Sequence, residues 1–63
     1  MDGQLLYRPE EGAEMLRVSR SRVFELLASG ELESVTIGRS RRIPREALEN
    51  YVRRLVGDTV PAA

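Results

Sequence analysis

The side chains best suited to chemistry in this sequence are its arginines, which gather in two short stretches. Residues 17–24 carry three arginines and residues 35–45 carry four, with no acidic residue in either stretch. The guanidinium group is planar, permanently charged and able to donate two parallel hydrogen bonds, which suits it to phosphate oxygens and to guanine. All ten basic residues are arginine, so a preference for arginine codons is the simpler explanation of the residue type itself. The clustering is what predicts a basic surface.

The formal net charge is zero, which taken alone argues against a nucleic-acid partner. The distribution argues the other way, because the two arginine stretches hold seven of the ten basic residues and the remaining segments are acidic on balance. A fold that brings the two stretches together would present a basic face on an acidic body. That is the electrostatic footprint of a protein that binds a phosphate backbone.

Catalysis and metal binding find little support in the composition. The chain has no cysteine and no histidine, which removes thiolate metal sites, the commonest zinc ligand and the commonest general base. Glu10 and Glu14 are spaced for one helix face, but without a histidine or cysteine nearby we interpret them as a solvated surface. No apolar run approaches the roughly 20 residues that a membrane span needs, and the N-terminus lacks the pattern of a signal peptide. We therefore expect a cytoplasmic protein that is not an enzyme and has no cofactor or metal.

Two helices are predicted in the first half of the chain, joined by a turn of a few residues. Pro9 suits the first turn of a helix, where its missing N–H is no loss. Ser19 is a favoured N-cap for a second helix over residues 20–29, and Gly30 suits its C-terminal end. We expect Val18, in the turn, to fill the angle between the two helices.

The second helix has an apolar face and a polar, basic face. Its apolar side chains recur at helical spacing and would face a core: Val23, Leu26 and Leu27. The opposite face carries Ser21, Arg22, Glu25 and Ala28, with Phe24 at its edge. A short turn between two helices, the second of them basic at its start, matches the helix-turn-helix pattern.

The period of the apolar residues changes to two after Gly30, which predicts a β-hairpin. Val35 and Ile37 would form one apolar face, residues 38–40 a turn, and residues 41–43 a basic return strand. Such a hairpin is not stable alone in water, so we expect it to lean on the helices.

A third helix is expected to begin at Pro44 and end at Gly57. It carries the clearest amphipathic stripe of the chain: Leu48, Tyr51, Val52 and Leu55. The expected organisation is one domain over residues 5–56. It begins with a short apolar segment, residues 5–7, which would form either one brief strand or an extended packing segment. Residues 1–4 and 57–63 are expected to be flexible termini.

Several of these segments together resemble a known family. Ala13, the Val18-Ser19 turn, Gly30-Glu31-Leu32, Ile37-Gly38-Arg39 and Arg42-Ile43-Pro44 recur in the order found in excisionase-type, MerR-like winged helix-turn-helix domains. The resemblance implies a mostly α fold with a small β-hairpin: a two-helix helix-turn-helix, a β-hairpin wing and a C-terminal packing helix. Arg8 stands where the family usually has a Thr or Ser cap, a loss of about 1 kcal/mol. Phe24 stands where the family often has Tyr, and Glu25 lies near the position of a family arginine.

The resemblance also implies which residues contact DNA. In the family the second helix enters the major groove and the wing reaches an adjacent minor groove. The expected DNA-contacting residues are Ser19, Arg20, Ser21, Arg22, Phe24, Glu25, Arg39, Ser40, Arg41 and Arg42. Arg22 would bind guanine and Glu25 would accept from cytosine N4, although Phe24 cannot donate to a phosphate and Glu25 would repel one. Arg41 and Arg42 would point to opposite faces of the hairpin and divide phosphate contact and packing between them.

The function implied is sequence-specific binding of double-stranded DNA as an excisionase, or recombination directionality factor. Such a protein binds and bends attachment-site DNA cooperatively, by head-to-tail self-association, and promotes excision by an integrase, with no small-molecule effector. One alternative is a small MerR-like transcriptional regulator, although the long dimerisation helix and effector domain usual in such regulators are not expected here. Another is a toxin–antitoxin or replication accessory protein whose main partner is protein.

Overall fold

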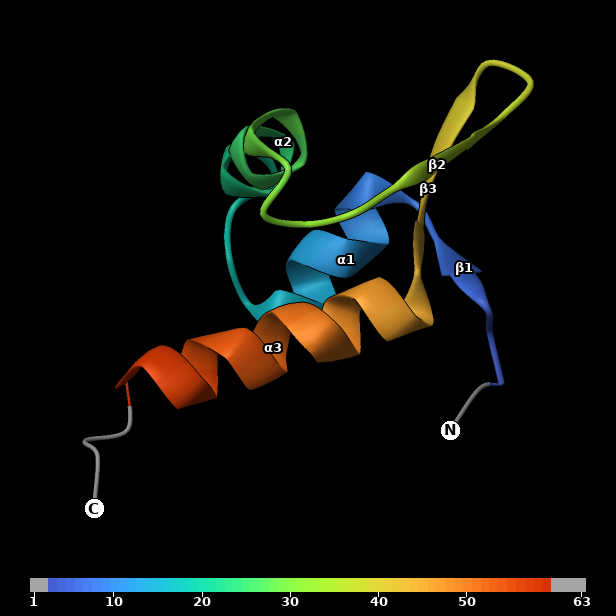
Figure 1. Cartoon of the computed structure of the whole chain (residues 1–63). Coiled ribbons are helices and arrows are strands. Elements are labelled where there is room, and N and C mark those ends of the chain that lie inside the picture. Colours follow the sequence, from blue (N-terminus) through green and yellow to red (C-terminus); the bar gives the residue numbers. More distant parts are fainter. Residues whose placement is uncertain (1–2, 60–63) are drawn as a thin grey trace.

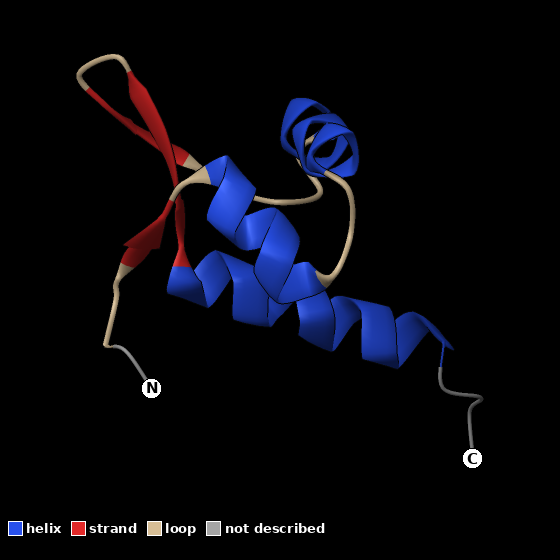
Figure 2. Ribbon diagram, turned by 180° about the vertical axis from the view of Figure 1, so that it is seen from behind, coloured by secondary structure: helices blue, strands red, loops and turns tan. Residues whose placement is uncertain are grey.

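The computed structural model describes residues 3–59, which form three helices and three strands. In chain order these are β1 (Leu6–Tyr7), α1 (Pro9–Leu16), α2 (Arg20–Ser29), β2 (Val35–Ile37), β3 (Ser40–Pro44) and α3 (Arg45–Thr59). Figure 1 shows α3 along one side of the molecule and α1 between α3 and α2. The β2–β3 hairpin projects away from the helices (Figure 2). This is the winged helix-turn-helix architecture predicted from the sequence.

The core is small and draws on every element except β2. Its nine buried side chains are Tyr7, Ala13, Val23, Leu26, Leu27, Leu32, Ile43, Ala47 and Leu48. Gly12 allows α1 to pack directly on β3, because a Cβ at this position would lie 3.0 Å from the Ile43 Cδ1 atom. The predicted inward face of the second helix is confirmed, since Val23, Leu26 and Leu27 are all buried.

The sheet consists of the predicted hairpin and β1, so of the two alternatives for residues 5–7 the brief strand is the one that forms. Its order is β1-β3-β2 with antiparallel pairing, and Tyr7 of β1 pairs with Ile43 at the base of β3. The expectation that the hairpin leans on the helices holds for β3, which contacts α1 and α3, but the apolar face of β2 is not covered: Val35 and Ile37 are 43% and 59% exposed. The hairpin extends past the body of the protein, so only its base, at Ile43, reaches the core.

Helix α3 differs from its prediction at both ends. Pro44 ends β3, so the helix begins at Arg45, and it continues through Gly57 to Thr59. The predicted stripe is only partly core: Leu48 is buried, Tyr51 is half-buried against the core, and Val52 and Leu55 are each 43% exposed. The C-terminal end of α3 runs beyond the other helices (Figure 1), while Val52 and Leu55 each line an open pocket and so are only partly covered. Of the predicted flexible termini, residues 1–2 and 60–63 lie outside the described residues.

The turn between α1 and α2 is held by main-chain hydrogen bonds. Arg17 has the left-handed conformation (φ 62°), and its N–H donates to the Glu14 carbonyl at 3.2 Å. The Val18 N–H donates to the Ala13 carbonyl at 3.0 Å, which completes a Schellman motif at the end of α1. The prediction that the Val18 side chain fills the interhelical angle is wrong, since this side chain is 39% exposed.

The start of α1 compensates in part for its missing cap. The Arg8 side chain caps nothing, but the Arg8 N–H donates to Glu11 Oε1 at 2.8 Å. Gln4, which is half-buried, donates from Nε2 to the Leu6 carbonyl at 3.0 Å.

Within residues 3–59, no helix combines the length and apolarity needed to cross a membrane.

Candidate nucleic-acid interface

Helix α2 presents its polar side chains outward because its apolar side chains are buried in the core. The Ser19 Oγ accepts a hydrogen bond from the Arg22 N–H at 3.1 Å, so the predicted N-cap is confirmed. The side chains on the outward face are all exposed: Arg20, Ser21, Arg22, Phe24 and Glu25. The sequence-predicted residues of this helix are therefore all accessible, with Ser21 and Glu25 near the centre of the outward side and Arg20 and Arg22 on its two flanks.

The wing, formed by β2, β3 and their turn, displays the second group of arginines. Gly38 has φ 63°, as the first central residue of a two-residue type II′ turn requires, and Arg39 follows it at the tip. Arg41 lies on the same face of β3 as buried Ile43, because strand side chains alternate. Arg42 lies on the other face, is half-buried, and donates from Nη1 to the Arg41 carbonyl at 2.9 Å. The two adjacent arginines thus have different surroundings, as the sequence predicted.

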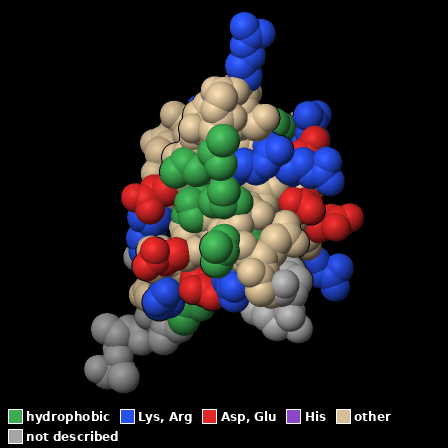
Figure 3. Space-filling model, turned by 90° about the vertical axis from the view of Figure 1, so that its right-hand side faces the viewer, with side chains coloured by type: hydrophobic (Ala, Val, Ile, Leu, Met, Phe, Trp, Pro, Cys, Tyr) green, Lys and Arg blue, Asp and Glu red, His purple; other side chains and the backbone are tan. Residues whose placement is uncertain are grey.

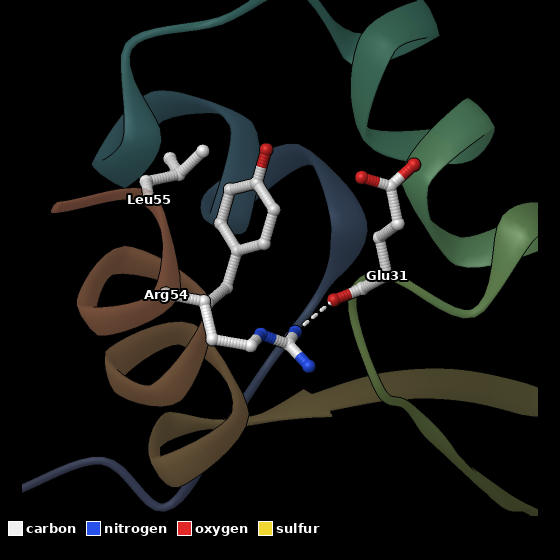
Figure 4. A pocket seen from close by; sticks show the side chains of 4 residues that line it. Glu31, Arg54 and Leu55 are labelled. Atoms are coloured by element: carbon white, nitrogen blue, oxygen red, sulfur yellow. Dashed lines mark hydrogen bonds between the residues drawn. The ribbon is translucent and has the colours of Figure 1, made fainter. Parts of the chain in front are cut away.

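Helix α2 and the wing project from the side of the molecule opposite α3, in both views of the ribbon (Figures 1 and 2). Their spacing is supported by a contact that sequence reasoning missed. Arg54 of α3 donates to the main-chain carbonyl of Glu31, in the segment that leads from α2 to β2 (Figure 4). Glu31, Tyr51, Arg54 and Leu55 line a pocket of about 230 Å³ at this point. The partners are 23 residues apart, so no local spacing in the sequence could have indicated the bond.

The α2 arginines are paired with acidic or aromatic groups. Arg22 Nη1 lies 3.0 Å from Glu25 Oε1, one turn further along the helix. Arg20 Nη2 lies 3.9 Å from Glu10 Oε2 of α1, and its guanidinium carbon lies 5.0 Å from the centre of the Phe24 ring. The role of Glu10 was also missed, because Glu10 and Arg20 meet only when the two helices pack.

Among residues 3–59, the wing arginines have no acidic or aromatic partner. Within the described part of the chain, Arg39 and Arg41 take part in no ion pair. Their charge is therefore fully available to an anionic partner. Residues 3–59 contain no group of three or more acidic side chains placed to hold a metal ion.

Comparison with known proteins agrees with this architecture. Residues 6–56 match the family model of a helix-turn-helix domain. A protein of Saccharopolyspora erythraea named "Probable excisionase" is 46% identical over 56 residues, which cover 89% of this chain and 57% of the relative. A protein of Streptomyces ambofaciens named "Excisionase" is 33% identical over 57 residues, which cover 90% of each chain. No solved structure gives a significant match. The chain belongs to the excisionase-type helix-turn-helix family.

Proposed function

We propose that this protein binds double-stranded DNA in a sequence-dependent manner, with α2 in the major groove and the wing in the adjacent minor groove. The observation that carries the proposal is that the outward face of α2 and the arginine wing project from one side of the molecule (Figure 1). An α-helix fits the width of the major groove, and a narrow minor groove concentrates negative potential that attracts arginine. The spacing of the two parts is held by the core and by Arg54.

The residues divide between reading bases and holding the backbone. Arg22 binds a guanine edge, where its planar fork meets O6 and N7. Ser21 lies beside it on the outward face, while Arg20 and the N-terminal N–H groups of α2 face phosphates. Arg39 enters the minor groove, and Ser40 and Arg41 contact the backbone at its edge. Arg42, half-buried at the base of the wing, contributes charge to every sequence alike.

The cellular role we propose is that of an excisionase, or recombination directionality factor, acting in the cytoplasm. The protein bends attachment-site DNA so that an integrase assembles the excisive complex, and it carries out no strand chemistry itself. The names of two relatives support this role. Wings that enter successive minor grooves would add bends in one direction, as an architectural protein requires.

The proposal also includes cooperative binding, in which copies of the protein lie head to tail on adjacent DNA sites. Two apolar surfaces support such a contact, and they lie on different sides of the molecule. One is the outer face of the sheet (Figure 3), where Val35 and Ile37 are exposed on the face opposite buried Ile43. The other is a groove of about 440 Å³ between α1 and α3, lined by Met15, Leu16, Leu48, Glu49, Val52 and Arg53. A contact between unlike surfaces does not close on itself, so it suits a row of copies rather than a symmetric dimer.

Footprinting on the attachment site of the mobile element that encodes the protein, together with sedimentation of the free protein, tests these proposals. We expect directly repeated protected sites and a monomer in solution. A Val52→Glu variant should lose cooperativity on a two-site duplex while its affinity for one site is unchanged. In an excision assay with the element's integrase, the wild-type protein should be required for product.

Two results would overturn parts of this assignment. An inverted repeat with a stable dimer in solution would indicate a small MerR-like transcriptional regulator instead. No binding to any duplex would contradict DNA binding itself and indicate an accessory protein whose main partner is protein.

A further inference from the structure

Arg22 and Glu25 form the shortest ion pair among the described residues, on the outward surface of α2. The Nη1–Oε1 distance is 3.0 Å, and the two side chains are 60% and 66% exposed. An exposed pair at this spacing contributes little to folding stability. The ion pair therefore matters mainly because it determines where the Arg22 guanidinium group lies.

The helical period gives the two residues unequal places on this surface. Val23, Leu26 and Leu27 define the buried side of α2. Glu25 then lies near the centre of the opposite side, whereas Arg22 lies on its flank. A flanking arginine is in reach of the backbone phosphates at the edge of a groove. The contact with Glu25 draws the Arg22 guanidinium toward the centre, where base edges would lie. One of its five N–H donors is used by Glu25, which leaves the others for a base.

Arg20 differs from Arg22 in this respect. It lies on the other flank, over the Phe24 ring at 5.0 Å and 3.9 Å from Glu10 of α1. These contacts hold it away from the centre of the surface. Of the two arginines that the structure describes in α2, Arg22 alone has a carboxylate that holds it toward the side on which base edges would lie.

We infer that Glu25 is a positioning residue that sets DNA selectivity through Arg22, rather than a direct contact to cytosine. Its carboxylate fixes the Arg22 guanidinium in a base-reading orientation. Its negative charge weakens binding to all DNA, and only a base that accepts from the positioned Arg22 compensates for that loss. The pair thus lowers the affinity for DNA in general and raises the selectivity for one base. This inference rests on the proposed DNA binding by α2.

The test is a set of dissociation constants for the natural site and for a scrambled duplex of equal length. Glu25→Ala should bind the scrambled duplex about two- to threefold more tightly, because a repulsive charge is lost. Its binding to the natural site should weaken, so that the ratio of the two constants falls about tenfold. Glu25→Gln keeps an acceptor for Arg22 but no charge, and it should give an intermediate ratio. Glu14→Gln removes an equal charge from α1 and should leave the ratio unchanged.

A double-mutant cycle separates positioning from direct contact. If Glu25 acts through Arg22, the variant with both Arg22→Ala and Glu25→Ala should have the same ratio as Arg22→Ala alone. Additive losses, with a separate change of preference at a cytosine, would overturn the inference and assign Glu25 to a base. An unchanged ratio in Glu25→Ala would also overturn it. If the wild-type protein bound both duplexes equally, the proposed function would fail first, and this result is distinct from the other two.

Discussion

Helix α2 and the wing carry similar arginines in opposite settings. On α2, Arg20 and Arg22 lie beside carboxylates, and the helix behind them is fixed by three buried side chains. On the wing, Arg39 and Arg41 have no acidic partner among the described residues, and β2 is exposed at every position. A rigid, charge-balanced surface suits selective contact, whereas an exposed and unbalanced one suits strong attraction to any phosphate backbone. The difference suggests that reading and holding are assigned to separate elements.

The sharpest test of this difference in packing uses two isoleucines of one hairpin. Ile43, at the base of β3, is fully buried, whereas Ile37, near the tip of the wing, is 59% exposed. Ile43→Ala should lower the free energy of unfolding by about 2–5 kcal/mol, a large fraction of the stability of so small a domain. Ile37→Ala should change it by less than about 0.5 kcal/mol. Urea denaturation measures both, and equal losses would mean that the wing is part of the core.

Removing charge from the wing should weaken binding to every sequence. In a variant with both Arg39→Ala and Arg41→Ala, the slope of log K against log salt should become less steep by about two, because two fewer charges release counterions. Natural and scrambled duplexes should be affected alike. On a duplex that holds a single copy, Arg53→Ala, on the opposite side of the molecule, is the matched control and should change little. A loss confined to the natural site would assign sequence reading to the wing.

Removing the arginine of α2 that is paired with Glu25 should have the complementary effect. Arg22→Ala should cost about 1–3 kcal/mol on the natural site and flatten the preference at one base position. Binding to the scrambled duplex should change far less. A fluorescence titration against single-base variants of the site gives this preference directly, and equal losses on both duplexes would remove the base-reading role from Arg22.

The smallest expected effect concerns two left-handed residues that end the helices of the motif. Gly30 occupies this conformation at the end of α2 (φ 83°) without strain, whereas Arg17 does so at the end of α1 (φ 62°) with a side chain. Arg17→Gly should therefore raise the melting temperature, with a gain of about 0.5–1 kcal/mol. Gly30→Ala should lose about 1 kcal/mol. A destabilised Arg17→Gly protein would mean that the arginine side chain holds the turn.

The sequence predicted this fold well wherever local spacing determines structure. The bounds of α2, its Ser19 cap and the Gly30 end follow from short-range preferences, and the structure confirms them. The pairing of β1 with β3 joins segments far apart in the sequence, and the exposure of Val35 and Val52 depends on whether another element covers them. Amphipathic spacing cannot predict this, because it indicates which side chains share a face and not what packs on that face.

For the candidate interface, the sequence predicted which arginines are exposed but not which groups they contact. The identity of its arginines followed from clustering and from family resemblance, and all of them reach the surface of α2 or the wing. The partners of those arginines were not predictable in the same way. Glu10 meets Arg20 only across two packed helices, and the orientation of Arg22 toward Glu25 depends on a choice of rotamer. These contacts are what distinguish the two regions.

The central claim is that the wing and α2 contribute separately to DNA binding. The most direct test is a salt titration of wild-type binding to the natural site and to a scrambled duplex. If the wing supplies the attraction common to all DNA and α2 supplies the selectivity, the two plots of log K against log salt should be parallel, with slopes of about −4. The natural site should lie above the scrambled duplex by a constant amount across the whole salt range. Slopes near zero would contradict the proposed electrostatic attraction, and two coincident lines would contradict the proposed selectivity.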